Sequence, residues 1–200
     1  MTRAAVDLNI FFKAEFAEHN DVARRTEAVL SNAFAKLVQA CATSIRAGGK
    51  LMFFGNGGSA ADAQHLATEL TVRYKKDRAA IAAIALTTDT SALTAAGNDL
   101  GFEKIFARQI EALGRKGDVA VAISTSGKSA NVIAGLKQAK AMGLATAAFG
   151  AGDGGSMPTH ADHLLLVPSA TTARIQEMHI LLGQMLCGAL EIELGLAAAR

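Results

Sequence analysis

Hydrophobic and polar positions alternate along this chain in two different rhythms. Within residues 7–19, the apolar side chains recur at the spacing of one helix face, at Leu8, Phe11, Phe12 and Phe16. A second helix is predicted for residues 22–47, because the two glycines that follow form a common helix-terminating signal. Residues 1–49 are therefore expected to form an N-terminal helical arm.

From residue 50 onward, short apolar segments alternate with segments of helical periodicity. The apolar segments predict five strands, at residues 51–54, 81–86, 118–124, 144–149 and 163–167. Helices are predicted after them, at residues 59–73, 91–96, 103–113, 129–142 and 172–194. This alternation predicts the α/β class: a doubly wound, parallel five-stranded sheet with helices on both faces and a long C-terminal helix. No linker divides the chain, so residues 1–200 are expected to form one domain, with the α/β core and closing helix in 50–200.

Composition narrows the classes of protein to which this chain can belong. Half of the residues are hydrophobic and 19% are charged, which is typical of a globular fold. A net charge of +2 is too small to argue for nucleic acid or an anionic membrane as a partner. Residues 1–9 do not resemble a secretory signal, and no apolar run approaches the roughly 20 residues of a membrane span. We therefore expect a soluble, cytoplasmic protein, in which Cys41 and Cys187 are buried free thiols.

Glycines crowd the turn after the first predicted strand, which reads Gly55-Asn56-Gly57-Gly58-Ser59. Such a turn lets the backbone approach a ligand closely, and the helix behind it presents N–H groups and a dipole that favour an anion. Ser59 is expected to cap that helix, with Asp62 completing a capping box. The alternative is a tight structural turn. A nicotinamide site is disfavoured, because the acid at the required spacing, Asp77, precedes the second strand instead of ending it.

A second turn, after the third strand, packs four hydroxyls and a glycine into Ser124-Thr125-Ser126-Gly127-Lys128-Ser129. Hydroxyls and backbone amides can donate together to the oxygens of one phosphate. The spacing of a P-loop is absent. Ligands of parallel sheets bind at the carboxyl ends of the strands, so both turns are predicted to hold a phosphorylated ligand there. A polar turn with a serine cap is the alternative.

Titratable side chains gather on two of the predicted helices. His65 and Glu69 are four residues apart and share one helix face, where they can bind a metal or place a base beside a polarising group. A surface ion pair is the competing interpretation. The closing helix opens with a polar cluster that is either functional or an ordinary exposed helix start, formed by Arg174, Gln176, Glu177 and His179. His19 is expected at an exposed helix end, and residues 160–163 in a surface turn.

Together these motifs resemble the phosphoheptose isomerase family, which has the sugar isomerase (SIS) fold. The resemblance rests on residues 55–65, 97–99, 124–129 and 174–177, and it extends to about residue 193. It implies isomerisation of sedoheptulose 7-phosphate to D-glycero-D-manno-heptose 7-phosphate, which feeds the core of bacterial lipopolysaccharide. It also implies a cytoplasmic homotetramer that binds zinc, one ion per subunit.

Carried over motif by motif, the resemblance assigns functional residues. Those expected to touch the sugar phosphate are Asn56, Gly57, Gly58, Ser59, Glu69, Asn98, Asp99, Ser124, Thr125, Ser126, Ser129 and Gln176. Those expected to bind zinc are His65, Glu69, Gln176 and Gln184. Glu69 and Gln184 occupy the catalytic positions. Aldose–ketose isomerisation through an enediol needs a base that moves a proton between neighbouring carbons and a group that stabilises the oxyanion, which Glu69 and zinc could supply.

Residue 184 departs from the family pattern, which places a histidine eight residues after the glutamine that Gln176 matches. Glutamine keeps an acceptor oxygen but has no nitrogen that titrates near neutral pH, and its amide is a weaker zinc ligand than imidazole. Gln176 and Gln184 are also about 12 Å apart along a helix axis. An impaired isomerase is one interpretation of this substitution, and His179 is an alternative proton carrier.

Gln184 also motivates two alternatives to an isomerase. A related protein that binds the bacterial replication initiator shares the fold, but it lacks both that histidine and the glutamate that Glu69 matches. A non-catalytic adaptor for the initiator is therefore one alternative, and a sugar-phosphate sensor is the other. The retained Glu69 and the complete glycine turn favour the isomerase. A homo-oligomer is expected in either case, because the closing helix and the phenylalanine-rich first helix are too apolar for a lone subunit.

Overall fold

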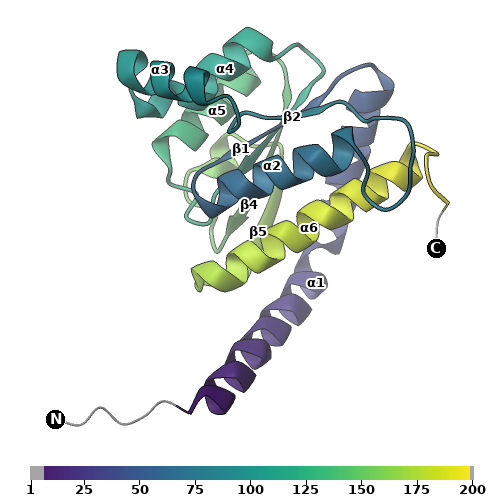
Figure 1. The fold of residues 1–200 in the computed structure, drawn as a ribbon, viewed down its shortest axis with the longest axis vertical. Helices are drawn as coiled ribbons and strands as arrows, with labels where there is room; N and C mark the ends of the chain where they lie inside the picture. The colour runs from purple at the N-terminus through teal and green to yellow at the C-terminus, as the bar shows by residue number, and fades with distance from the viewer. Residues whose placement is uncertain (1–6, 199–200) are drawn as a thin grey trace.

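The computed structural model describes residues 7–198 as a parallel sheet with helices on both faces (Figure 1). The strands are β1 (Leu51–Gly55), β2 (Ala83–Ala85), β3 (Val119–Ile123), β4 (Ala145–Ala151) and β5 (His163–Val167). They hydrogen-bond in the order β2-β1-β3-β4-β5, and every neighbouring pair is parallel. The predicted fold class is confirmed. Most of the stretch judged not to be a secretory signal, residues 1–6, lies outside the described residues.

Alternate residues of each strand feed two separate cores. Leu51 and Phe53 of β1 face one core, whereas Met52 and Phe54 face the other. The helices that cover the first core are α1 (Leu8–Arg46), α2 (Gly58–Thr71) and α6 (Thr172–Glu193). Those that cover the second core are α3 (Thr90–Leu100), α4 (Ile105–Leu113) and α5 (Ala130–Ala141). Because helices cover both faces of the sheet, the strands consist mostly of apolar residues.

The chain reverses direction across the sheet between β1 and β3. From β1 it passes to β2 on one side, and then returns to β3 on the other side of β1. At such a switch point the connections leave in opposite directions, and a crevice opens at the carboxyl ends of the strands. The two turns predicted to bind phosphate follow β1 and β3. The sheet therefore places both turns at its carboxyl edge, at the switch point.

The N-terminal arm is one helix and not two. α1 is unbroken, so the predicted separation of residues 7–19 from residues 22–47 is wrong. Neither glycine nor proline interrupts this stretch. Asp21 also forms ion pairs with Arg24 and Arg25, both at 2.9 Å, and pairs three and four residues apart stabilise a helix.

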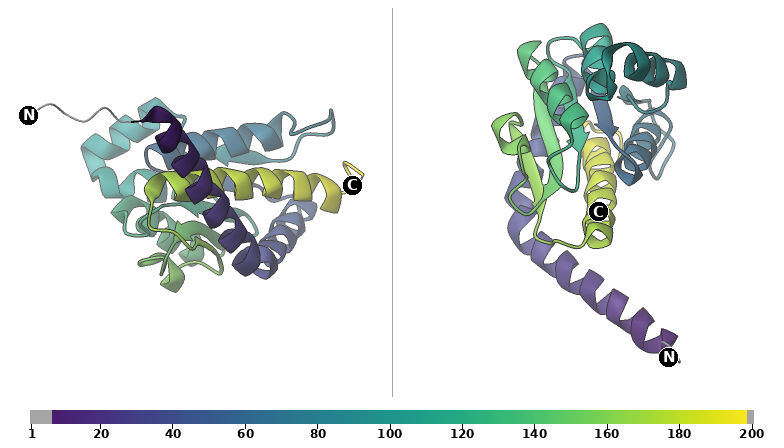
Figure 2. Two further views of the ribbon diagram at one scale, coloured as in Figure 1. Left: turned by 90° about the horizontal axis from the view of Figure 1, so that it is seen from below. Right: turned by 90° about the vertical axis from the view of Figure 1, so that its left-hand side faces the viewer.

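The first turns of α1 project beyond the sheet (Figures 1 and 2). Their large apolar side chains are exposed, namely Leu8, Ile10, Phe11, Phe12 and Phe16. Further along, the helix packs against α6 and β5. Within residues 7–198, α1 is the one helix long and apolar enough to span a membrane, a property that the sequence analysis did not assign to it. Core helices of globular proteins meet the same criterion, so this is weak support for a membrane segment.

Helices α2 and α6 run side by side in the same direction (Figure 1). Two glycines of α6 bring them close together. A Cβ atom on Gly183 would lie 2.5 Å from the side chain of Leu66, and one on Gly188 would lie 2.9 Å from the Tyr74 ring. Gly183 therefore lets α6 approach α2 closely, and Gly188 makes room for Tyr74, which lies in the loop after α2. This α2–α6 pair carries most of the candidate chemistry.

The other elements lie within a few residues of their predicted positions. The edge strand β2 is shorter than predicted, with three residues instead of six. Helix α3 is longer, because Asp89 caps its start and Gly101, with φ of +92°, ends it. Cys41 and Cys187 are both buried and free, as predicted, and burial raises the pKa of each thiol to about 12.

Substituting Gly183→Ala is expected to destabilise the protein by about 1–2 kcal/mol, because overpacking against Leu66 outweighs the gain in helix propensity. Gly97→Ala in α3 is the matched control. Its Cβ would meet nothing closer than Ile105, at 3.9 Å. That variant is expected to gain up to about 1 kcal/mol. Urea unfolding of both variants measures the difference, and a stabilised Gly183→Ala variant would contradict close packing of α2 and α6.

Candidate functional site

The first candidate anion site is the turn between β1 and α2. Gly57 has φ of +56°, a conformation that other residues rarely adopt, and it occupies the N-cap position of α2. No side chain caps the helix. Its first N–H groups, together with the positive end of the helix dipole, therefore lie at the carboxyl edge of the sheet without a competing side-chain acceptor.

The prediction that Ser59 caps α2 is wrong. The helix begins at Gly58, so Ser59 lies in its first turn and is buried against Gly55. Asp62 consequently completes no capping box. Its Oδ2 is buried without a hydrogen-bond partner, and burial raises the pKa of this carboxyl. The cap moved because only glycine tolerates the turn geometry at position 57.

The second candidate anion site is the turn between β3 and α5. Gly127, with φ of +62°, forms its apex and lies against Gly154. The Ser124 hydroxyl accepts from the N–H of Gly127, and the Ser126 hydroxyl accepts from the N–H of Lys128, both at 3.2 Å. These hydroxyls shape the turn and still have a proton to donate. Ser129 occupies the N-cap of α5, but its side chain makes no capping hydrogen bond.

A reciprocal pair of amides joins the two turns. Asn56 and Asn131 each donate a hydrogen bond to the other's carbonyl oxygen, both at 2.8 Å. Asn131 is buried and also accepts from the N–H of Val132. The amide of Asn56, predicted to touch the substrate, thus holds the turns at a fixed separation. Sequence reasoning missed Asn131, whose one signal was a polar residue in the first turn of the helix that follows the serine-rich turn.

Three of the predicted functional side chains meet between α2 and α6. His65 Nε2 lies 2.9 Å from Glu69 Oε1, and Gln184 Nε2 lies 3.5 Å from the same imidazole nitrogen. A half-turn of the Gln184 amide exchanges its nitrogen and oxygen, so either atom can face the imidazole. The His65 side chain is 45% exposed and that of Glu69 is 21% exposed, so a ligand can reach both.

Gln176 lies near the N-terminal ends of α2 and α6, apart from these three side chains. A Cβ atom on Gly58 would be 2.5 Å from Gln176 Nε2, which places this amide beside the first anion site. No hydrogen bond links Gln176 to His65, Glu69 or Gln184 among residues 7–198. The structure therefore brings together three of the four predicted zinc ligands.

His65 and Glu69 offer two of the atoms that zinc commonly binds, and any further protein ligand here from residues 7–198 has to be an amide oxygen. An imidazole nitrogen and a carboxylate oxygen are common zinc ligands, and His65 and Glu69 turn theirs toward each other. The described residues contain no group of three or more histidine, cysteine, aspartate and glutamate side chains that could hold a metal. The amide of Gln184 would complete a set of three side-chain donors.

Asn98 and Asp99 lie apart from these groups. Both are on α3, against the opposite core, and the Asn98 amide donates to Asp99 at 2.7 Å. Asp99 lines a mostly apolar cavity of about 530 Å³ between α3, α4 and β2. No hydrogen bond connects either residue with the two turns within the described part of the chain. Their predicted contact with the substrate stays a prediction.

The polar start of α6 has a structural role. Arg174 is 7% exposed, and it donates to Glu177 at 2.5 Å and to the main-chain carbonyl of Glu15 at 2.7 Å. His19 pairs with Glu177 at 2.7 Å from the middle of α1, so its predicted position at an exposed helix end is wrong. Arg174, Glu177 and His19 therefore fasten α6 to α1.

His179 does not serve the candidate site as an alternative proton carrier. It is fully buried, and its Nε2 lies 3.0 Å from the carbonyl oxygen of Gly150 on β4. Burial lowers the pKa of this histidine, and the hydrogen bond with Gly150 opposes that effect. A helix face that points into the core cannot be told from sequence periodicity alone, because α6 is apolar on most of its surface.

Known proteins match this chain over most of its length. The SIS domain family matches residues 16–151. A phosphoheptose isomerase of Paramagnetospirillum magneticum is 59% identical over 90% of this chain and 94% of its own. One from Campylobacter jejuni is 53% identical over 86% of this chain and 92% of its own. The solved phosphoheptose isomerase of Neisseria gonorrhoeae has a TM-score of 0.87 at 44% identity, and covers 92% of this chain and 98% of its own. This chain belongs to the phosphoheptose isomerase family.

Membership of the phosphoheptose isomerase family confirms the resemblance found in the motifs. Position 184 departs from the family motif, which has a histidine there. In this chain the Gln184 amide lies 3.5 Å from the imidazole of His65. The side chain at position 184 therefore keeps its place beside His65 and Glu69 but cannot exchange a proton.

Proposed function

We propose that this chain isomerises sedoheptulose 7-phosphate to D-glycero-D-manno-heptose 7-phosphate through an enediol. The observation that carries the proposal is the pairing of Glu69 with His65 at 2.9 Å, beside Gln184. A carboxylate that an imidazole holds in place is well suited to act as a base. The name that the relatives of this chain share supports the same reaction.

Glu69 is the base in this proposal. Its carboxylate removes a proton from C1 of the ketose, the C1–H electron pair forms the C1=C2 bond, and the C2=O electron pair moves onto oxygen. Glu69 then returns the proton to C2 while O1 loses its own proton and C1 becomes the aldehyde carbon. Gln184 can donate a hydrogen bond to the oxyanion but cannot give up a proton. Water has to carry the proton from O1 to O2, and turnover is slower for that reason.

The phosphate end of the substrate belongs at the two turns. The N-terminus of α2 and the hydroxyls of Ser124 and Ser126 lie at the carboxyl edge of the sheet, and the pair formed by Asn56 and Asn131 links the two turns. Glu69 follows Gly58 by eleven residues, about 16 Å along the helix. Its carboxylate reaches back to within 2.9 Å of His65 Nε2, one helical turn closer to Gly58. A seven-carbon sugar has the length to reach from the turns to Glu69. Its phosphate then orients C1 and C2 against the base, which accounts for much of the rate in such reactions.

Zinc is the cofactor that we propose for this site. His65, Glu69 and Gln184 would hold it, with Gln176 as the fourth ligand that the family resemblance implies. When bound, zinc supplies Lewis-acid polarisation of the substrate carbonyl. The amide oxygen of Gln184 is a weaker ligand than imidazole, so zinc is held less tightly than by a histidine at the same position.

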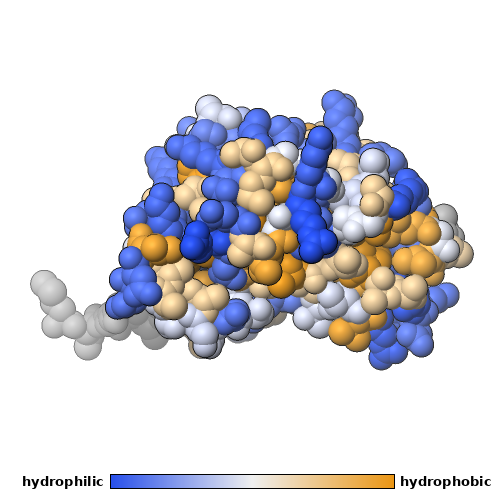
Figure 3. Space-filling model, turned by 90° about the horizontal axis from the view of Figure 1, so that it is seen from above, coloured by the Kyte–Doolittle hydropathy of each residue, from blue (hydrophilic) through white to orange (hydrophobic). Residues whose placement is uncertain are grey.

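A homotetramer is the proposed assembly. Exposed apolar side chains cover the projecting turns of α1, and an apolar groove of about 650 Å³ runs between α1 and α6. Side chains that line the groove include Leu30, Phe34, Leu181, Leu182 and Met185. Further apolar patches lie between hydrophilic residues on another face of the molecule (Figure 3). Surfaces of this kind are typical of contacts between subunits, and α1 of a second copy has the apolar side chains to fill the groove.

We place the activity in the cytoplasm, where it would supply heptose for lipopolysaccharide. The two buried free thiols agree with a reducing compartment, in which cysteines stay unpaired. The net charge of +2 offers nucleic acid no strong attraction.

Substituting Glu69→Gln is expected to lower kcat for sedoheptulose 7-phosphate by about 10²- to 10⁴-fold, because general-base catalysis contributes that much. Gln184→His is expected to raise kcat, because imidazole can carry the proton between the two oxygens. Glu111→Gln, at an exposed glutamate of α4, is the matched control and should leave kcat unchanged. The measurement is the rate of aldose formation with added zinc.

Absence of turnover in both the natural chain and Gln184→His would overturn the isomerase. Calorimetry with sedoheptulose 7-phosphate would then separate a sensor, which binds the sugar, from an adaptor. Specific capture of the replication initiator from lysate would support the adaptor.

Zinc affinity is expected to rise at least about tenfold in Gln184→His, a gain of roughly 1.4 kcal/mol, because imidazole replaces an amide. His65→Ala is expected to lower it. His160→Ala, at the turn before β5, is the control. Competition with a chromophoric chelator measures the affinity without any assay of turnover. Equal affinities in all variants would place zinc elsewhere.

Light scattering is expected to give a mass about four times the 20.7 kDa of one chain. Glutamate at both Leu181 and Met185 is expected to dissociate the assembly, because it puts charge into the apolar groove. Leu113→Glu is the control, at a leucine of α4 with the same exposed fraction as Leu181, 43%. A mass near 20.7 kDa for the natural chain would refute the oligomer.

A further inference from the structure

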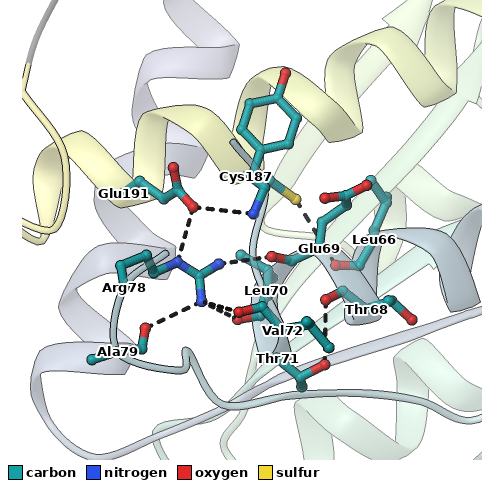
Figure 4. A network of polar contacts seen from close by, with 11 residues as sticks. Leu66, Thr68, Glu69, Leu70, Thr71, Val72, Arg78, Ala79, Cys187 and Glu191 are labelled. Carbon is teal, nitrogen blue, oxygen red and sulfur yellow. Dashed lines mark hydrogen bonds and ion pairs between the residues drawn. The ribbon is translucent and has the colours of Figure 1, made fainter. Parts of the chain in front are cut away.

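A buried guanidinium closes the C-terminal end of α2. Arg78 lies in the loop between α2 and β2, and its side chain is 2% exposed. Its Nη2 donates to the main-chain carbonyl of Glu69 at 2.7 Å, and its Nη1 donates to that of Leu70 at 2.8 Å (Figure 4). Carbonyls in the last turn of a helix have no N–H partner within it. A cation there satisfies them and complements the helix dipole.

The same guanidinium is fastened to α6. Arg78 Nε donates to Glu191 Oε1 at 2.9 Å, and the N–H of Tyr74 donates to the same oxygen at 3.3 Å. The Glu191 side chain is 3% exposed. An ion pair buried this deeply gives little net stability compared with two apolar side chains of similar volume. It does fix a separation and an orientation, because the donors of a guanidinium point in set directions.

The two helices that Arg78 joins carry the proposed reacting groups. Glu69 stands on α2 and Gln184 on α6, and Arg78 is hydrogen-bonded to the main chain of Glu69 itself. Glu191 follows Gln184 by seven residues, which is about two helical turns, so both lie on the side of α6 that faces α2. Sliding α6 along α2 would break the contact between Arg78 and Glu191 and would separate Gln184 from His65.

We propose that Arg78 and Glu191 form a register clamp, a positioning pair that holds Glu69 in place relative to Gln184 and the bound sugar. Neither side chain touches the reacting atoms. The inference rests on the proposed isomerase activity. The phosphate turns lie at the opposite end of α2, so loss of the clamp should lower kcat and leave the KM for the sugar phosphate nearly unchanged.

Arg78→Lys is the first test. Lysine keeps the charge beside Glu191, but a single ammonium cannot serve Glu191 and both carbonyls in the geometry of a guanidinium. We expect kcat to fall at least about tenfold, because small misplacements of a reacting group lower rates strongly, with KM within about twofold of the natural value.

The double variant Arg78→Met with Glu191→Leu separates positioning from stability. Apolar side chains of similar volume can replace a buried ion pair without loss of stability. The main-chain carbonyl of Glu69 and the N–H of Tyr74 also lose their partners, so we expect a Tm somewhat below that of the natural chain. At temperatures at which the variant is folded, we expect a kcat as low as that of Arg78→Lys. Wild-type kcat in the double variant would overturn the clamp.

Lys50→Met is the matched control. It removes the partly buried ion pair of Lys50 with Asp118, at 2.5 Å, which lies at the amino ends of the strands, away from the α2–α6 pair. This variant is expected to lose stability while its kcat stays at the natural value. The comparison shows that losing a buried ion pair does not by itself reduce turnover.

Amide hydrogen exchange tests the clamp without any turnover. In Arg78→Lys, exchange is expected to speed up in peptides that cover residues 66–72 and 180–187, and to stay unchanged elsewhere. If the natural chain proves inactive, the proposed function fails, and the exchange pattern alone decides the clamp. Unchanged exchange in these two segments would overturn it.

Discussion

Close parallel packing of α2 against α6 is the constraint on which the candidate site depends. Gly183 removes a side chain that would otherwise hold the helices apart, so Leu66 rests directly on α6. Gly188 does the same for Tyr74 in the loop after α2. At that separation the amide of Gln184 comes within 3.5 Å of His65. A wider spacing would leave His65 and Glu69 as an ordinary ion pair on one helix. The glycines of α6 thus make a two-helix site out of side chains that are far apart in sequence.

The sheet and the helix pair divide the work of positioning. The reversal of strand order between β1 and β3 brings the two turns to neighbouring strand ends, and the amides of Asn56 and Asn131 set their spacing. The α2–α6 pair sets the reacting end of the site. Helix α2 belongs to both systems, because its N-terminus forms one candidate anion site and its later turns carry His65 and Glu69. One helix therefore contributes to binding both ends of the proposed sugar substrate.

Features that depend on local rules could be predicted from the sequence, and features that depend on distant partners could not. The alternation of apolar strands with helices was enough for the fold, and glycine spacing was enough for the turn at Gly57. Asn131 and Arg78 escaped prediction because their roles depend on groups elsewhere in the fold. His179 was misassigned since α6 offers no polar face from which to orient it. The predicted break in α1 was wrong, because a polar residue such as Asp21 does not end a helix unless a competing turn is available.

The common direction of the helices links the folding of this protein to its ligand. Every strand is parallel, so α2, α5 and α6 all begin at the carboxyl edge of the sheet and place their positive poles close together. Like poles side by side repel each other, and a phosphate bound at that edge would neutralise them. At the C-terminal, negative end of α2, the guanidinium of Arg78 supplies a positive charge whether or not a ligand is bound. A ligand that binds only the folded chain stabilises it by about 2.7 kcal/mol at a hundredfold excess over its Kd. The supply of phosphorylated sugar would thus set how much of this protein stays folded under thermal stress, as well as how fast it works.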